Sequence, residues 1–249
     1  MKKIVSILLL SIFVFSLVGC GTATDKDTFV IATDKTYPPF VMEDMAGELT
    51  GIDMDLIRAI VNDQDIKIEI RPLGFDAATT ALESGEADAV IAAMTITNAR
   101  KEKYDFSEPY FDTGVTLGVA KGSDISSYED LRGQTVVAKT STTGLAYAES
   151  IQDQYGFKLE VVEESTFMFE KVKSGEAVAC FEDEPVLQYM ISNGQLDFEL
   201  PFEKSFSAQY GFAVLKGENN ELLEMFNAGL ENIRASGEYD AILDTYLNR

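Results

Sequence analysis

The stretches LESGEADAV at residues 82–90 and VKSGEAVAC at residues 172–180 resemble each other, and the second follows the first at a distance of ninety positions. Each follows a phenylalanine-containing segment with helical spacing, passes through Ser-Gly and continues into an apolar run. Ser-Gly is typical of a helix end, and an uninterrupted apolar run is typical of a strand that is buried on both faces. The repeat therefore predicts two similar α/β units in one chain.

Strand-like and helix-like segments alternate on both sides of this repeat. FVIATD at 29–34 parallels TVVAKT at 135–140, and each places a charged residue next to the end of an apolar strand. Such alternation indicates an α/β sheet architecture. The other expected elements are strands at 67–70 and 87–93 and helices at 53–61, 75–83, 145–152 and 221–247, the last divided at Gly237.

The composition excludes several chemistries. The 249 residues include 20 Lys and Arg, 42 Asp and Glu, two cysteines and no histidine, which gives a formal net charge of −22. Without imidazole there is no Ser-His-Asp or Cys-His nucleophile pair, and two cysteines cannot form a four-thiolate zinc site. The negative charge opposes binding to nucleic acid and to anionic lipid surfaces. We therefore expect no metal, no cofactor and no polyanionic partner.

The N-terminus reads as an export signal. Lys2 and Lys3 precede an apolar run at 4–18 that is too short for a comfortable membrane span. The ending LVGC at 17–20 resembles the lipobox of bacterial lipoproteins, in which cleavage precedes a lipid-bearing cysteine; an ordinary secretion signal is the alternative. The predicted boundaries are a lipoprotein signal peptide at 1–19 and a lipidated polar tether at 20–28 that begins with Cys20.

Polar and aromatic residues cluster just after the predicted strands. In an open α/β sheet, ligands sit beyond the carboxyl ends of the strands, so these positions are the candidates for a binding site. The candidates are Asp34, Tyr37, Phe75, Thr95, Thr97, Arg100, Lys139, Ser141, Thr142, Thr143 and Asp183.

The types of these residues suit a free amino acid. Arg100 supplies a guanidinium that can clamp a carboxylate through two hydrogen bonds. Thr142 and Thr143 open a predicted helix, whose free backbone N–H groups also favour a carboxylate. Asp183 is placed to receive an ammonium group, with the hydroxyl of Thr95 as a second acceptor. Together these residues predict an amino-acid site.

Two aromatic residues, Tyr37 and Phe75, are expected to flank the ligand side chain. Simpler interpretations of the charged residues remain open at this point. Arg100 is also compatible with a solvated helix face, the two aspartates with helix caps, and Lys139 with an ordinary exposed lysine. Thr97 is better interpreted as the N-cap of the helix through Arg100 than as a ligand-binding residue.

Several longer motifs resemble the family 3 extracellular solute-binding proteins, the amino-acid-binding proteins of bacterial ABC importers. The resemblance covers essentially the whole chain after the signal peptide. The motifs that carry it are ATD at 32–34, YPPF at 37–40, GIDMDL at 51–56, MTITNAR at 94–100, FSEPY at 106–110, DLRGQ at 130–134 and YGFAV at 210–214.

The resemblance implies a periplasmic-binding-protein type II fold, in which two α/β lobes are joined by two hinge strands and the ligand lies in the cleft. The chain would cross near 110–114 and return near 207–211. It also implies a monomer that is not an enzyme. This monomer would work with a membrane permease on the extracytoplasmic face of the cell membrane. The implied domains are lobe 1 at 29–111 and 212–249, and lobe 2 at 112–211 with the hinge strands.

The resemblance also assigns roles within the cleft. Arg100, the backbone of Thr95 and the threonine turn would hold the α-carboxylate, while Asp183, Thr95 and the carbonyl group of Ala93 would hold the α-ammonium. The family often has glycine where Ala93 and Ser141 stand here. The complete predicted set is Asp34, Tyr37, Phe75, Ala93, Met94, Thr95, Arg100, Lys139, Thr142, Thr143 and Asp183.

Ligand preference depends on Asp34 and Lys139. They resemble the pair that faces the side-chain amide in glutamine-binding members, one accepting from the NH₂ group and the other donating to the carbonyl oxygen. Glutamine is therefore the leading ligand, and asparagine and glutamate are alternatives. Glutamate would gain from Lys139, but Asp34 and Glu182 would oppose its extra charge.

Two rival functions remain. The first is an enzyme similar to cyclohexadienyl dehydratase on the same fold, with Glu182 as its general acid. The second is a surface adhesion lipoprotein, which would leave the charged residues at the strand ends without a role.

Overall fold

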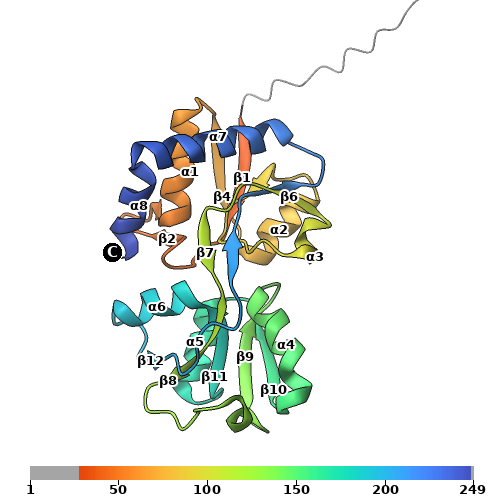
Figure 1. Cartoon of the computed structure of the whole chain (residues 1–249), viewed down its shortest axis with the longest axis vertical. Coiled ribbons are helices and arrows are strands. Elements are labelled where there is room, and N and C mark those ends of the chain that lie inside the picture. The colour runs from red at the N-terminus through yellow and green to blue at the C-terminus, as the bar shows by residue number, and fades with distance from the viewer. Residues whose placement is uncertain (1–27, 248–249) are drawn as a thin grey trace, which may run out of the picture.

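The structure, a computed structural model, describes residues 28–247 and consists of two α/β lobes, drawn one above the other in Figure 1. The predicted signal peptide, most of the predicted tether with Cys20, and the last two residues lie outside the described residues. Between residues 28 and 247, no helix combines the length and the apolar character that a membrane crossing requires.

Lobe 1 is built on a five-stranded mixed sheet. Its first three strands are parallel, and the strand contributed by the C-terminal part of the chain pairs antiparallel with its two neighbours. The order across the sheet is β4 (Ile68–Pro72), β1 (Phe29–Thr33), β5 (Ala89–Val90), β14 (Ala213–Leu215) and β6 (Tyr104–Phe106).

Five helices and a small hairpin complete lobe 1. Close packing joins its N-terminal and C-terminal parts, because Gly229 lets the C-terminal helix approach Ile60, where a Cβ atom would come within 2.8 Å. The elements are α1 (Ile52–Asp63), α2 (Phe75–Glu83), α3 (Asn98–Lys101), α7 (Asn220–Ser236) and α8 (Glu238–Leu247), with the hairpin strands β2 (Met42–Glu43) and β3 (Leu49–Thr50).

Lobe 2 repeats this plan. Three parallel strands are followed by one that runs antiparallel to them and by a short edge strand, in the order β10 (Lys158–Val162), β9 (Thr135–Lys139), β11 (Ala179–Asp183), β8 (Val115–Ala120) and β12 (Phe198–Glu199). Its helices are a 3-10 turn, η1 (Tyr128–Leu131), and α4 (Thr143–Tyr155), α5 (Ser165–Ser174) and α6 (Glu184–Ser192).

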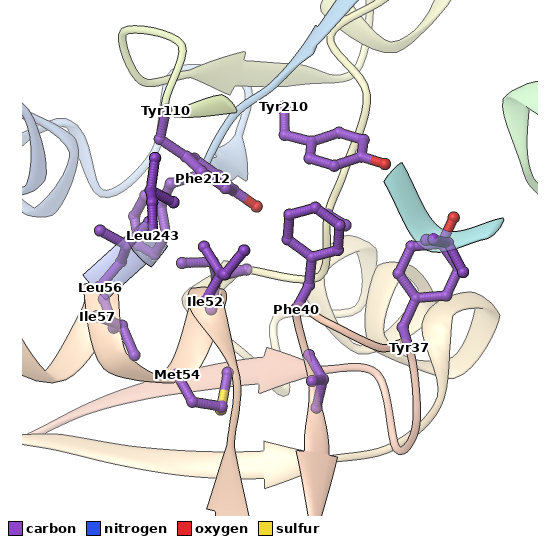
Figure 2. Close-up of a cluster of buried hydrophobic side chains, with 14 of the residues drawn as sticks. Tyr37, Phe40, Ile52, Met54, Leu56, Ile57, Tyr110, Tyr210, Phe212 and Leu243 are labelled. Atoms are coloured by element: carbon purple, nitrogen blue, oxygen red, sulfur yellow. The ribbon is translucent and has the colours of Figure 1, made fainter. Parts of the chain in front are cut away.

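Two short strands connect the lobes. β7 (Phe111–Thr113) enters lobe 2 and β13 (Ala208–Tyr210) returns from it, and the two pair antiparallel as a separate sheet (Figure 1). Lobe 1 is therefore made of two stretches of chain. Phe40 of lobe 1 packs edge-on against Phe111 and Tyr210, with ring centroids 4.9 and 5.0 Å apart, so the hydrophobic core of lobe 1 extends to the hinge (Figure 2).

The sequence repeat corresponds to equivalent elements of the two lobes. α2 and α5 end at the two Ser-Gly pairs, and Gly85 and Gly175 adopt φ angles of 75° and 77°. The strands that follow, β5 and β11, each occupy the centre of a five-stranded sheet. The predicted α/β class with two lobes is thus confirmed.

One predicted strand is much shorter than expected. The apolar run at 87–93 pairs as a strand only at Ala89–Val90. Ala93 has a φ of 47°, which is incompatible with an extended strand, so the chain turns out of the sheet. The division of the C-terminal helix at Gly237, where φ is 82°, is confirmed.

A pair of glycine substitutions tests how lobe 1 is built. Gly51 begins α1 with a φ of 117°, and a Cβ atom there would lie 2.3 Å from the carbonyl oxygen of Phe40. Gly47 also has a positive φ, of 81°, but faces open space. Both alanines would be strained by a positive φ, but the φ and ψ of Gly51 suit only glycine and its Cβ would also clash, so Gly51→Ala should destabilise by at least about 2 kcal/mol more than Gly47→Ala.

Urea denaturation followed by far-ultraviolet circular dichroism measures this difference. Equal losses from the two substitutions would contradict the close approach of α1 to Phe40.

Candidate functional site

A small cavity of about 20 Å³ lies between the lobes, where the carboxyl ends of β1 and β5 face those of β9 and β11. All of the predicted ligand-binding residues except Met94 line it, and Ala92 joins them. The lining residues are Asp34, Tyr37, Phe75, Ala92, Ala93, Thr95, Arg100, Lys139, Thr142, Thr143 and Asp183.

Arg100 stands at one end of the cavity. Its guanidinium donates to the carbonyl oxygen of Thr95 at 2.8 Å and, across the lobes, to that of Ser141 at 3.0 Å. The guanidinium carbon lies 5.1 Å from the centre of the Phe75 ring, in cation–π geometry. The hydroxyl of Thr97 accepts from the backbone N–H of Arg100, which confirms Thr97 as the N-cap of α3.

The start of α4 lies at the same cavity. Thr142 is its N-cap, because its hydroxyl accepts from the backbone N–H of Leu145 at 3.1 Å, and Thr143 is the first helical residue. Gly144 allows the helix to approach β11, since a Cβ atom there would lie 2.8 Å from the carbonyl oxygen of Phe181. The first turn of a helix presents free N–H groups, so this end of the cavity favours an anion.

Asp183 forms a second, negative end. It is buried, its Oδ2 accepts from the hydroxyl of Tyr210 at 2.6 Å, and its Oδ1 accepts from Thr143 Oγ1 at 3.4 Å. Thr143 Oγ1 is also 3.4 Å from Thr95 Oγ1, so Asp183 and Thr95 belong to the same end. Asp183 precedes α6, but its side chain makes no capping hydrogen bond, which excludes the simple helix-cap interpretation. Burial raises the pKa of Asp183.

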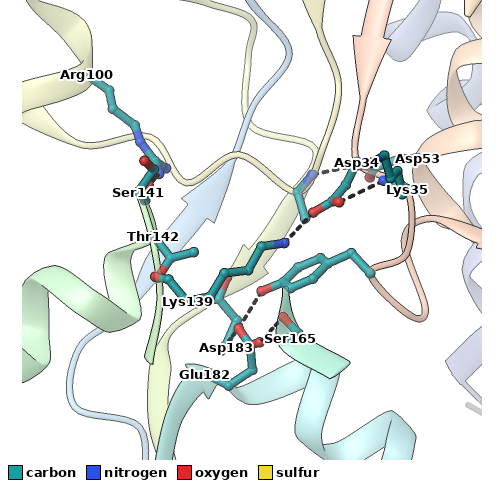
Figure 3. A network of polar contacts seen from close by, with 12 residues as sticks. Asp34, Lys35, Asp53, Arg100, Lys139, Ser141, Thr142, Ser165, Glu182 and Asp183 are labelled. Carbon is teal, nitrogen blue, oxygen red and sulfur yellow. Dashed lines mark hydrogen bonds and ion pairs between the residues drawn. The ribbon is translucent and has the colours of Figure 1, made fainter. Parts of the chain in front are cut away.

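The third group in the cavity is an ion pair that spans the lobes. Lys139 Nζ lies 2.6 Å from Asp34 Oδ2, and both side chains are at most 3% exposed (Figure 3). Lys139 also lies over the ring of Tyr37, 5.2 Å from its centre. The interpretation of Lys139 as an exposed surface lysine is therefore wrong, and Asp34 pairs with it instead of capping a helix.

Glu182 adjoins the cavity without lining it. Its carboxylate accepts three hydrogen bonds: from the Tyr37 hydroxyl of lobe 1 at 2.7 Å, from the Ser165 hydroxyl at 2.8 Å and from the backbone N–H of Asp183 at 2.9 Å. Burial first, and then the neighbouring charge of Asp183, raise the pKa of Glu182 to about 7. Tyr37 thus presents its ring to the cavity and its hydroxyl to the opposite lobe.

The structure differs from the predicted site at a few residues. Met94 is fully buried in the core of lobe 1 with Ala32 and Phe75, because the turn at Ala93 directs it away from the cavity. Tyr210, which holds Asp183, was not predicted as a site residue. Its place in the YGFAV motif, within the expected return at 207–211, is the signal that would have indicated it.

The raised pKa of Glu182 predicts a pH-dependent stability. Between pH 4.5 and 7 the folded state keeps a proton that the unfolded chain releases, so the free energy of unfolding should fall as pH rises through this window. Glu182 alone should account for on the order of 2 kcal/mol between pH 5 and 8. Chemical denaturation across this range should show a shallower fall for Glu182→Gln, whereas the exposed control Glu163→Gln should keep the original slope. Parallel profiles for all three proteins would argue against this assignment.

Comparison with known proteins shows which family has this sequence and this fold. The sequence pattern of the bacterial extracellular solute-binding proteins, family 3, matches residues 29–249. The glutamine-binding protein GlnH of an ABC transporter of Bacillus subtilis (strain 168) is 30% identical over 99% of this chain and 98% of its own length. The arginine-binding extracellular protein ArtP of the same organism is 28% identical over 97% and 96%.

Solved structures agree with these relatives. An ancestral arginine-binding protein bound to glutamine is 37% identical, covers 90% of this chain and 99% of its own, and superposes with a TM-score of 0.82. An ancestral amino-acid-binding protein described as a precursor of cyclohexadienyl dehydratase is 32% identical, with coverages of 88% and 95% and a TM-score of 0.80. From the match over residues 29–249, the two-lobe fold and these relatives, the chain belongs to the bacterial extracellular solute-binding proteins of family 3.

Proposed function

We propose that the protein captures a polar L-amino acid, with glutamine as the leading candidate, and delivers it to the permease of an ABC importer. A lipid on Cys20 would hold it on the extracytoplasmic face of the membrane. One observation carries the proposal: a single cavity between the lobes contains an anion-binding end at Arg100, a negative end at Asp183 and the Asp34–Lys139 ion pair.

The anion-binding end at Arg100 and the negative end at Asp183 suit the two charged groups that all amino acids share. The guanidinium of Arg100 and the N-terminus of α4 would receive the α-carboxylate. Asp183 and the hydroxyl of Thr95 would receive the α-ammonium. Both charges of the zwitterion would then meet opposite charges in a site that excludes water, where such contacts are strongest.

The ion pair would select the ligand side chain. A carboxylate acceptor beside an ammonium donor offers both partners that a primary amide needs, so Asp34 and Lys139 favour glutamine and, with a shorter reach, asparagine. Glutamate would place a third carboxylate near Asp34 and Glu182. A cationic side chain would meet Lys139 at close range. The relatives are named for arginine as well as glutamine, so these charges, rather than the fold, would decide the preference.

Binding would proceed by hinge motion about β7 and β13. Several contacts join the lobes across the cavity, among them Lys139 with Asp34, Tyr37 with Glu182, and Arg100 with the carbonyl oxygen of Ser141. A ligand that first meets lobe 1 would be enclosed when Asp183 and Lys139 of lobe 2 close onto it. The contacts of the ligand with Asp183 and Lys139 would exist only in the closed form. Ligand binding would therefore increase the population of that form.

The rival enzyme would use Glu182 as a general acid. One structural relative is described as a precursor of cyclohexadienyl dehydratase, so this enzyme is the rival activity to consider. However, Glu182 does not line the cavity, and three donors from Tyr37, Ser165 and the backbone of Asp183 engage its oxygens. A general acid must lie within hydrogen-bond reach of its substrate. The geometry therefore favours binding without turnover.

A ligand screen tests the proposal directly. Residues 21–249 should be stabilised by glutamine, and a ligand at one hundred times its dissociation constant adds about 2.7 kcal/mol. Thermal unfolding with each of the common amino acids, followed by calorimetry on those that stabilise, measures the effect. Stabilisation by none of them would overturn amino-acid capture, a preference for arginine would overturn the glutamine assignment alone, and turnover of arogenate or prephenate would establish the enzyme.

Two substitutions separate the shared contacts from the selective ones. Arg100→Ala should weaken every amino-acid ligand at least a hundredfold, since each loses its carboxylate partner. Lys139→Ala leaves Asp34 buried without its partner, so it should weaken all ligands, but unequally, and the order of preference should change. The exposed residues Arg58 and Lys101 provide matched alanine controls that should leave binding unchanged. Equal losses for all ligands in Lys139→Ala would refute its selective role, and calorimetry measures all four variants.

A further inference from the structure

Asp53 is a buried aspartate in the first turn of α1 that has no place in the site described so far. Its side chain is completely shielded from solvent, and its Oδ2 accepts a hydrogen bond from the backbone N–H of Ala93 at 2.7 Å. Burial raises the pKa of this carboxyl group, while the buried hydroxyl of Tyr110, its other polar neighbour, helps to lower it. Burying a carboxyl group costs free energy, so its short bond to the Ala93 backbone calls for an explanation.

That contact leads to the cavity wall. Ala93 lines the cavity and has a φ of 47°, in the left-handed region that residues with a Cβ atom rarely adopt. This turn ends the strand β5 and begins the segment that carries Thr95 into the cavity. The carboxylate of Asp53 therefore engages the backbone at the point where the wall departs from regular structure.

We propose that Asp53 is a positioning residue for the ammonium end of the cavity, which it shapes by holding the Ala93 peptide in its left-handed conformation. Through this peptide, Asp53 sets where Ala93 and Thr95 of lobe 1 stand relative to Asp183 of lobe 2. The link to Asp183 runs through Thr143, whose hydroxyl is 3.4 Å from Thr95 Oγ1 and 3.4 Å from Asp183 Oδ1. The inference rests on the proposed capture of an amino acid in this cavity.

The helix dipole would be a simpler explanation for an aspartate at this position, but it does not account for the contacts of Asp53. An acidic residue in the first turn stabilises a helix through the helix dipole, but Asp55, which is partly exposed, already occupies that turn. A dipole partner has no need of burial or of a bond to a residue forty positions away.

The role of Asp53 rests on an oxygen acceptor at a fixed place and not on its charge. Burial raises the pKa of Asp53 to about 7, and the charge of Asp34 acts in the same direction. A neutral carboxyl group still offers a carbonyl oxygen to the Ala93 N–H. Asparagine has the same shape and the same oxygen, so it should replace Asp53, whereas alanine should not.

The test measures by calorimetry the affinity of two ligands for the unaltered protein and for the variants Asp53→Ala and Asp53→Asn. The ligands are the amino acid that binds most tightly in the screen and its analogue without the α-amino group, which for glutamine is 5-amino-5-oxopentanoate. Asp53→Ala should lose at least tenfold in affinity for the amino acid but less than threefold for the analogue. Asp53→Asn should stay within threefold of the unaltered protein for both.

A second substitution at the turn provides a matched control. In combination with Asp53→Ala, Ala93→Gly should recover part of the lost affinity relative to Ala93→Gly alone, because glycine adopts the left-handed conformation without help. If Asp53→Ala does not fold, Asp53→Ser replaces it, since the shorter side chain still suits a first helical turn but does not reach the Ala93 N–H.

Equal losses for the two ligands, no loss for either, or an asparagine variant as weak as the alanine variant would each overturn the inference. These outcomes differ from a failure of the proposed function, in which the unaltered protein itself binds no amino acid.

Discussion

The buried ion pair between Asp34 and Lys139 constrains how the two lobes meet across the cavity. Each charge belongs to a different lobe, and both side chains are almost completely buried. Burying one of them alone would cost several kcal/mol, so the closed arrangement requires both. Buried pairs seldom add net stability compared with apolar residues, so the role that we propose for this pair is ligand selectivity. A neutral but strongly polar subsite is what an amide side chain requires.

The repeated α/β unit explains how such a site arises. In both lobes the central strand follows a helix that ends at Ser-Gly, and in both the residues that line the cavity lie at or just beyond the carboxyl ends of the parallel strands. Two sheets that face each other at their carboxyl ends therefore bring charges of both signs into one cavity. β7 and β13 connect the two halves, and Tyr210 at the end of β13 donates a hydrogen bond to Asp183.

Local patterns predicted most of this arrangement. Phe75–Glu83 as a helix, Thr97 as an N-cap and Gly237 as a helix break follow from spacing and from backbone preferences of neighbouring residues. The shortened strand at Ala89–Val90 was missed because a left-handed alanine leaves no mark in an apolar run. The Tyr37–Glu182 contact joins residues 145 positions apart and arises only when the lobes meet, so no local pattern encodes it.

The most direct test of the central claim measures the distance between the lobes. Spin labels on exposed positions of each lobe, such as Glu86 and Asp153, would report their separation by pulsed electron resonance without ligand and with saturating amino acid. The account predicts a broad or longer distribution without ligand that becomes narrow and shorter with it. An unchanged distribution, with ligand binding verified on the same sample, would contradict capture by closure of the cleft.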